Sequence, residues 1–188
     1  MPTLIYLHGF ASGRQSSTAG KLLSVFAEAV IAEYDTLDPL KGEAQLAALI
    51  ASHLPAGEVI LVGTSLGGFW AQYFAAKYQL KALLVNPAVH PSATLQQAIG
   101  EVTNFSTGAV GCLTAENVAR YRRFEDCFGG LLSVLVYTGD ELLPYQATVA
   151  YFQAHRVQVI AGGGHRIESI DAVVREVNYL ASLPPLGD

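Results

Sequence analysis

Charged side chains are scarce in this sequence of 188 residues: Asp, Glu, Lys and Arg together make up 14% of it, against about 25% in an average soluble protein. The formal net charge is −5, so there is no excess of basic residues. Because binding to a nucleic-acid backbone requires a basic face that neutralises phosphates, the composition argues against nucleic acid as a partner. The apolar share of 51% is too high for a disordered chain and suits strands buried on both faces.

Cysteine and long apolar runs are also scarce. The two cysteines, Cys112 and Cys127, have neither the spacing of metal ligands nor a C-x-x-C arrangement, which predicts two reduced thiols. No apolar run approaches the roughly 20 residues that cross a membrane. The start of the chain lacks the basic stretch and apolar core of a signal peptide. We therefore expect a cytoplasmic protein without a membrane span.

Short β-rich runs alternate with helical patterns along the chain. Strands are expected at 3–7, 29–34, 59–62, 82–85, 131–137 and 157–160, and helices at 15–30, 43–54, 65–78, 144–155 and 167–183. Six strands that alternate with helices predict right-handed βαβ crossovers and a mostly parallel sheet with helices on both faces. The length fits a single domain that covers residues 1–188.

One segment, at 92–130, is not needed by this alternation. It holds two weak helical patterns, at 94–99 and 115–124. Because excursions of about 40 residues in a compact domain are usually functional, we predict a small cap-like insertion over the site. A plain surface insertion is the alternative. Within the segment, three arginines could hold a phosphate-bearing leaving group or form a solvated helix face: Arg120, Arg122 and Arg123.

The pentapeptide Gly63-Thr64-Ser65-Leu66-Gly67 matches the pattern G-x-S-x-G and stands directly between an expected strand and an expected helix. This is the setting that a nucleophile elbow requires. The turn is so tight that side chains at 63 and 67 would collide, which glycine avoids. The pattern predicts that Ser65 is a nucleophile at the carboxyl edge of the sheet, where open α/β sheets bind ligands. A structural glycine-rich turn is the alternative.

A serine hydroxyl needs a base, and the base needs a group that orients it. On this kind of fold they follow in the order Ser, acid, His, each in a loop after a later strand. Asp140 follows the strand at 131–137, and His165 follows the strand at 157–160. We therefore predict Asp140 as the acid and His165 as the base, with Glu141 as the alternative acid.

The stretch His8-Gly9-Phe10 ends the first expected strand. Acyl transfer develops an oxyanion, which backbone N–H groups must stabilise. One donor is the residue after the nucleophile, here Leu66, and the other comes from a loop after a neighbouring strand, here Phe10. His8 precedes the nucleophile in the sequence, so we expect it to organise this loop rather than act as the base.

Together these motifs resemble the YqiA-like family of small bacterial esterases within the α/β-hydrolase superfamily. The matching stretches are 3–10 (TLIYLHGF), 62–69 (VGTSLGGF), 85–91 (VNPAVHP), 137–145 (YTGDELLPY) and 161–165 (AGGGH). The resemblance implies a three-layer α/β-hydrolase fold that lacks the first two strands of larger hydrolases. It also implies esterase or thioesterase activity without a cofactor or metal, and a catalytic triad of Ser65, Asp140 and His165. The chain departs from the family's pattern at His90, where Arg is usual, and at Gly164, where Asn is common; both leave the substrate open.

The expected activity is hydrolysis of a small ester or thioester, and its acyl group is expected to be apolar. The motivating side chains surround the predicted site or lie in the predicted cap: Phe10, Phe69, Trp70, Leu142, Leu143, Leu95, Ile99, Phe105, Val110 and Leu113. The alternative for at least half of them is a place in the hydrophobic core. An acyltransferase with the same triad is an alternative. A non-hydrolytic ligand-binding protein on the same fold is another.

Overall fold

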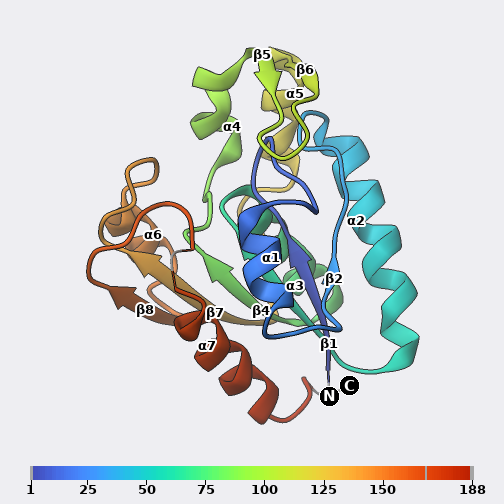
Figure 1. Cartoon of the computed structure of the whole chain (residues 1–188), viewed down its shortest axis with the longest axis vertical. Coiled ribbons are helices and arrows are strands. Elements are labelled where there is room, and N and C mark those ends of the chain that lie inside the picture. The colour runs from blue at the N-terminus through green and yellow to red at the C-terminus, as the bar shows by residue number, and fades with distance from the viewer. Residues whose placement is uncertain (1, 168, 187–188) are drawn as a thin grey trace.

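The computed structural model describes residues 2–167 and 169–186. Six strands form one sheet in the order β2-β1-β3-β4-β7-β8, and every neighbouring pair is parallel (Figure 1). The strands are β1 (Thr3–Leu7), β2 (Val30–Ile31), β3 (Val59–Thr64), β4 (Lys81–Val85), β7 (Leu131–Tyr137) and β8 (Arg156–Ile160). The predicted parallel sheet is therefore confirmed.

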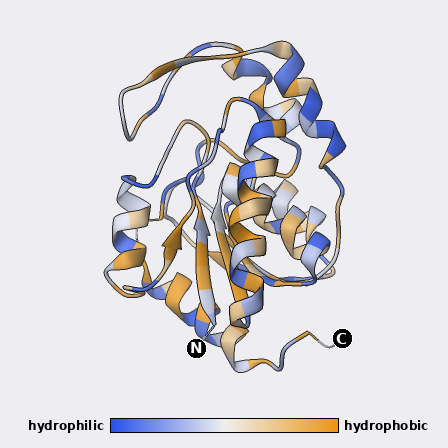
Figure 2. Ribbon diagram, turned by 90° about the vertical axis from the view of Figure 1, so that its right-hand side faces the viewer, coloured by the Kyte–Doolittle hydropathy of each residue, from blue (hydrophilic) through white to orange (hydrophobic). Residues whose placement is uncertain are grey.

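Helices cover both faces of this sheet and make a three-layer fold. One face packs against α2 (Pro39–His53), α3 (Leu66–Tyr78) and α6 (Tyr145–Tyr151), and the other against α1 (Ser17–Leu23) and α7 (Asp171–Ser182). Successive residues of a strand point to opposite faces, so Leu61 of β3 joins the first core and Ile60 joins the second. Apolar residues accordingly concentrate in the central strands (Figure 2). The predicted fold class is confirmed.

Several predicted boundaries were wrong. The helix expected at 15–30 ends at Leu23, and the strand expected at 29–34 is only the two residues of β2. Helix α2 begins four residues earlier than expected, because the Asp38 side chain accepts hydrogen bonds from the N–H groups of Leu40 and Lys41. The last helix begins at Asp171 rather than at 167; residue 168 of that prediction lies outside the described residues.

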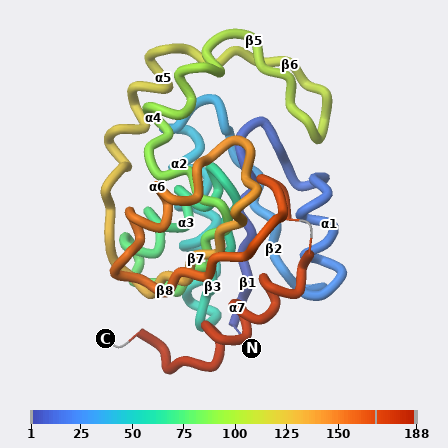
Figure 3. The backbone as a smooth tube through the Cα atoms, turned by 90° about the vertical axis from the view of Figure 1, so that its left-hand side faces the viewer, coloured from blue at the N-terminus to red at the C-terminus, as the bar shows by residue number. Residues whose placement is uncertain are grey.

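The segment between β4 and β7 contains an antiparallel hairpin that the sequence did not predict. Its strands are β5 (Gly100–Thr103) and β6 (Val110–Leu113), and it is flanked by α4 (Pro91–Thr94), η2 (Leu95–Ala98), α5 (Ala115–Arg120) and η3 (Tyr121–Arg123). In Figures 1 and 3 this segment lies at the end of the molecule toward which the sheet strands point. The hairpin tip contacts the loop after β1, since Phe105 N–H donates to the Ala11 carbonyl at 2.7 Å.

Within the described residues, none of the helices has the length and apolar character that crossing a bilayer requires.

Candidate active site

Ser65 is the residue that joins β3 to α3, and its backbone is held in an unusual conformation. Its φ is 53° and its ψ is −120°, a region that residues with a side chain rarely adopt. Its N–H donates to the Val85 carbonyl at 3.1 Å, and its carbonyl accepts from Gly68 at 2.9 Å and from Ala88 at 3.1 Å. These bonds from three directions fix the turn despite the strain.

The glycines around Ser65 are required by the close approach of backbone segments. A Cβ atom at Gly63 would overlap the Gly67 carbonyl, and a Cβ atom at Gly67 would overlap the carbonyl groups of Leu7 and His8. The backbone cannot move away, because β1 and β3 are neighbouring strands. The side chains predicted to collide at positions 63 and 67 would therefore collide with backbone atoms, because backbone segments approach each other closely there.

The strain at Ser65 predicts an unusual order of stability. Ser65→Gly is expected to have a larger free energy of unfolding than Ser65→Ala, by about 1 kcal/mol. Relief of a strained backbone is worth about 1–3 kcal/mol, and the entropy of glycine in the unfolded chain offsets about 0.5–1 kcal/mol of it. Urea unfolding of both variants measures the difference. If the glycine variant is the less stable of the two, the backbone at position 65 is not strained.

The ring of His165 is hydrogen bonded to Asp140. Its Nδ1 lies 2.8 Å from Asp140 Oδ2 and 3.0 Å from Oδ1, and the side chains of His165 and Asp140 are 13% and 2% exposed. Asp140 Oδ1 also accepts the backbone N–H groups of Leu142 and Leu143, both at 2.9 Å. Glu141 instead accepts the backbone N–H of His165 at 2.9 Å. The carboxylate at the imidazole is therefore Asp140, and Glu141 contacts the loop backbone.

These hydrogen bonds determine the charge of Asp140. Burial alone would raise its pKa, but hydrogen bonds from the His165 ring and from the N–H groups of Leu143 and Leu142 lower the pKa below the ordinary value. Asp140 is therefore ionised at neutral pH. An ionised acceptor at Nδ1 places the proton of a neutral imidazole on Nδ1, which leaves Nε2 as the basic nitrogen.

The lowered pKa of Asp140 predicts how stability depends on pH. A carboxyl group whose pKa is lower in the folded than in the unfolded chain stabilises the fold above its unfolded pKa, about 3.9. That contribution is lost as the pH falls through the lower, folded pKa. Between about pH 5 and pH 2, the free energy of unfolding of Asp140→Asn should fall less steeply than that of the wild type. Parallel slopes in urea unfolding over this range would show that Asp140 has the same pKa in both states.

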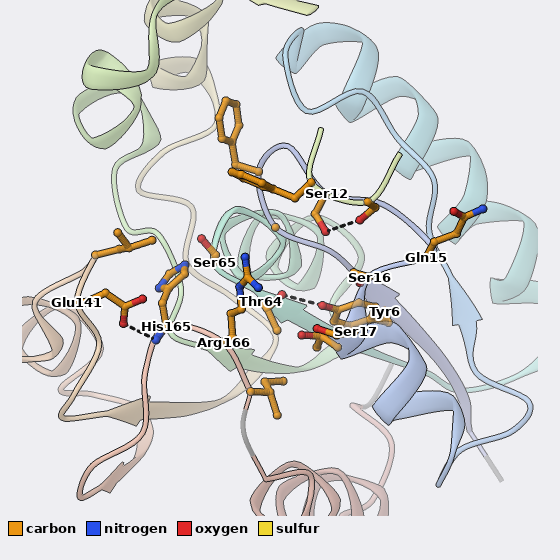
Figure 4. Close-up of a pocket in the computed structure, with 17 residues that line it drawn as sticks. Tyr6, Ser12, Gln15, Ser16, Ser17, Thr64, Ser65, Glu141, His165 and Arg166 are labelled. Carbon is orange, nitrogen blue, oxygen red and sulfur yellow. Dashed lines mark hydrogen bonds between the residues drawn. The ribbon is translucent and has the colours of Figure 1, made fainter. Parts of the chain in front are cut away.

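Ser65 and His165 line one open cleft of about 600 Å³ (Figure 4). The Ser65 hydroxyl has no hydrogen-bond partner among residues 2–167 and 169–186, so Ser65 Oγ and the His165 ring, the predicted nucleophile and base, are not hydrogen bonded to each other in this structure. Such bonds are often long in the free enzyme and shorten when substrate binds. Nε2 of His165 likewise has no partner in the part of the chain that the structure describes.

The loop after β1 runs directly against Ser65. A Cβ atom built on Gly9 would lie 3.4 Å from Ser65 Cβ and 3.9 Å from Ser65 Oγ. The N–H groups of Phe10 and Leu66, the predicted oxyanion donors, have no acceptor among the described residues. Leu66 is the first residue of α3, where N–H groups have no acceptor within the helix. Both donors therefore remain available to a ligand.

His8 is buried in this loop, with 1% of its surface exposed. Its ring stacks on Tyr34 at a centroid distance of 4.5 Å, and its carbonyl accepts the Tyr34 hydroxyl at 2.5 Å. Burial lowers the pKa of His8, so its ring is neutral at pH 7. These contacts agree with a role in organising the loop, and His8 is not among the residues that line the cleft.

The apolar wall expected around the site is present in part. Of the predicted wall residues, Phe10, Phe105 and Leu142 line the cleft. Phe69 and Trp70 are 2% and 0% exposed and belong to the core between α3 and the sheet. The polar residues of the lining are Ser12, Gln15, Ser16, Ser17, Thr18, Thr64, Ser65, Ser106, Glu141, His165 and Arg166.

Arg166 is the charged lining residue that the sequence interpretation did not name. Its side chain points into the cleft beside His165 (Figure 4). Its position directly after the predicted base, in a glycine-rich loop, was the signal that could have identified it. The three arginines considered for a phosphate do not line the cleft, and Arg120 pairs with Glu116.

Cys112 and Cys127 are free thiols, as predicted. No group of three or more His, Cys, Asp or Glu side chains with the geometry to hold a metal ion occurs among the described residues.

The fold is that of the α/β hydrolases. Est1E from Butyrivibrio proteoclasticus, in a structure with ferulic acid bound, superposes with a TM-score of 0.72 at 17% identity, over 96% of this chain and 88% of that one. A monoacylglycerol lipase from Paleococcus ferrophilus superposes with a TM-score of 0.65 at 14% identity, over 97% and 96% of the two chains. At these identities the likeness establishes the fold alone.

The chain belongs to the uncharacterised protein family UPF0227, which matches residues 3–181 and is the YqiA-like family that the motifs resemble. A UPF0227 protein from Shewanella oneidensis is 26% identical over 156 residues, which are 77% of this chain and 84% of that protein. A second, from Shewanella sp. strain ANA-3, is 27% identical over 169 residues, 84% of this chain and 93% of that protein.

Proposed function

We propose that this chain is a serine hydrolase that cleaves carboxylic esters or thioesters through an acyl-enzyme. In this proposal Ser65 is the nucleophile, His165 the base and Asp140 the carboxylate that orients it. One observation carries the proposal: a serine on a strained strand-to-helix turn lines the same cleft as an imidazole whose Nδ1 is bonded to a buried carboxylate. This combination is what nucleophilic catalysis by serine requires.

The first half of the proposed reaction forms the acyl-enzyme. Ser65 Oγ attacks the carbonyl carbon of the substrate while His165 Nε2 takes the hydroxyl proton. The carbonyl oxygen becomes an oxyanion, and the N–H groups of Phe10 and Leu66 donate to it. When the tetrahedral intermediate collapses, the bond to the leaving group breaks, and His165 returns the proton to the departing alcohol or thiol.

The second half releases the acid. His165 Nε2 takes a proton from water, whose oxygen attacks the acyl carbon, and the new intermediate collapses with return of the proton to Ser65 Oγ. Asp140 stabilises the imidazolium in both halves and does not itself take up a proton. The segment 92–130 serves as a cap in this proposal, since its hairpin tip contributes Phe105 and Ser106 to the cleft.

A fluorophosphonate probe tests the proposal directly. We expect labelling of one serine per chain, assigned by peptide mass spectrometry to Ser65, and no labelling of Ser65→Ala. Ser106→Ala is the matched control, because Ser106 also lines the cleft but lies outside the strained turn. Labelling that survives in Ser65→Ala, or is lost in Ser106→Ala, would assign the nucleophile elsewhere.

Two other functions use the same fold. An acyltransferase would label in the same way but would pass its acyl group to an acceptor other than water, so product analysis with and without added alcohols separates it from a hydrolase. A ligand-binding protein would show no turnover. The cytoplasmic location expected from the sequence is part of the proposal, and cell fractionation tests it.

A further inference from the structure

We infer that Arg166 binds an anionic group of the substrate, so that the preferred esters or thioesters carry a carboxylate or a phosphate. This inference rests on the proposed hydrolase function and specifies its substrate class. Arg166 lines the cleft that holds Ser65 and His165, and its guanidinium makes no ion pair or hydrogen bond with any described residue. In Figure 4 the Arg166 side chain projects into the cleft, on the side of His165 that is turned toward Ser16 and Ser17.

The two carboxylates of the neighbouring loop, those of Asp140 and Glu141, are hydrogen bonded to groups other than Arg166. Asp140 accepts the ring of His165 and two backbone N–H groups, and Glu141 accepts the backbone N–H of His165. Neither is bonded to Arg166. An unpaired guanidinium in a cleft is suited to a ligand anion, because its planar set of donors matches the two oxygens of a carboxylate or phosphate.

The backbone on either side of Arg166 is held in place. His165 is fixed through its ring and its N–H, and Ile167 is 2% exposed within the core beneath α1 and α7. The carbonyl of Ile167 also accepts Lys21 Nζ at 2.7 Å, which ties this segment to α1. The arginine therefore projects from an anchored segment, and less conformational freedom is lost when it binds an anion.

One part of the remaining lining is polar. Residues 12–18 contribute five polar residues to the lining: Ser12, Gln15, Ser16, Ser17 and Thr18. Burying a long apolar chain against these groups would remove water without replacing its hydrogen bonds, which is unfavourable. A short acyl group leaves these polar side chains in contact with water and can lie against Phe10, Phe105 and Leu142. Arg166 therefore adds one charged anchor to a cleft whose lining is polar and apolar in similar measure.

The test compares matched substrates that differ in one anionic group. In the first pair, 4-nitrophenyl butyrate and the 4-nitrophenyl monoester of succinate share a four-carbon acyl chain, and only the succinate ester carries a carboxylate; its spontaneous hydrolysis is subtracted. In the second pair, butyryl-coenzyme A carries phosphates on the leaving group, and butyryl-N-acetylcysteamine is its neutral counterpart. For each pair the ratio of kcat/KM, anionic over neutral, is measured in wild type and in Arg166→Gln.

We expect Arg166→Gln to lower this ratio about 10- to 100-fold in at least one pair, since a hydrogen bond between charged groups contributes on that scale. Loss in the first pair identifies a carboxylate in the acyl group, and loss in the second identifies a phosphate in the leaving group. Arg123→Gln is the matched control, because it removes the same charge from an exposed residue outside the cleft. A ratio that changes no more than in this control, in both pairs, overturns the inference.

A binding measurement separates failure of the inference from failure of the proposed function. Ser65→Ala is titrated by calorimetry with monomethyl succinate and with methyl butyrate, with and without Arg166→Gln. Tighter binding of the succinate ester that Arg166→Gln abolishes supports anion recognition even if the wild type cleaves no ester. If Ser65 turns over neutral esters, and neither kcat/KM nor binding favours an anionic substrate, the proposed hydrolase function stands and the proposed role of Arg166 is rejected.

Discussion

Ser65→Ala is expected to lower kcat for ester hydrolysis about 10³- to 10⁶-fold, the range found when a triad nucleophile is removed. The substitution deletes the one hydroxyl that lies on the strained turn and leaves the cleft otherwise unchanged. Residual rate would come from substrate binding and from the proposed oxyanion donors alone. The effect is measured by steady-state hydrolysis of 4-nitrophenyl butyrate and of the 4-nitrophenyl monoester of succinate. Release of nitrophenolate is followed by its absorbance at about 400 nm.

The control for this experiment is a measurement that Ser65→Ala is still folded. Ser65→Ala should unfold cooperatively in urea, because Ser65 makes its hydrogen bonds through its backbone and none through its hydroxyl in the described part of the chain. Ser65→Gly should lose as much activity as Ser65→Ala. A kcat within about tenfold of wild type in a folded Ser65→Ala protein would remove Ser65 from the mechanism.

The elements that position the site could be predicted because their signals are local. The strands β1 and β7 have the predicted bounds, since both are buried β-rich runs that end at turn residues. The elbow was also predictable, because the backbone overlap at Gly63 and Gly67 leaves no other residue for those positions.

The hairpin β5–β6 could not be predicted in the same way. Its strands are largely exposed, with Val110 at 63% exposure, so they lack the apolar run or the strict alternation that marks a buried strand. Its position depends instead on contacts with residues far away in the sequence, such as the hydrogen bond from the Asn104 side chain to the Ser12 carbonyl at 2.9 Å. The length of α1 was overestimated for a related reason: Phe26 continues the helical spacing but packs against the core from the irregular segment after the helix.

The lining of the site also depended on tertiary structure. Phe69 and Trp70 follow the predicted nucleophile directly, yet a helix turns by about 100° per residue and α3 directs both rings into the core. Adjacency in sequence therefore did not mean adjacency to the cleft. Arg166 is the opposite case, since a position next to the predicted base also placed a charge beside it.

Asp140 and Glu141 are adjacent residues that both carry a carboxylate, and the loop conformation alone gives them different hydrogen-bond partners. The turn that brings Asp140 Oδ1 to two backbone N–H groups aims its carboxylate at the His165 ring, and Glu141 is left with the backbone N–H of His165. This difference makes the pair a matched test, because both substitutions remove one negative charge from the same loop.

Asp140→Asn is expected to lower kcat roughly 10³- to 10⁴-fold, whereas Glu141→Gln should lower it less than about tenfold. An amide at position 140 cannot stabilise the imidazolium and can present its NH₂ group to Nδ1, which favours the wrong tautomer. The amide oxygen of Gln at 141 can still accept the N–H of His165. The ratio of kcat values gives the main result, and the proton resonance of His165 Nδ1–H should disappear or shift in Asp140→Asn alone. If Glu141→Gln causes the larger loss, the acid of the proposed triad is Glu141.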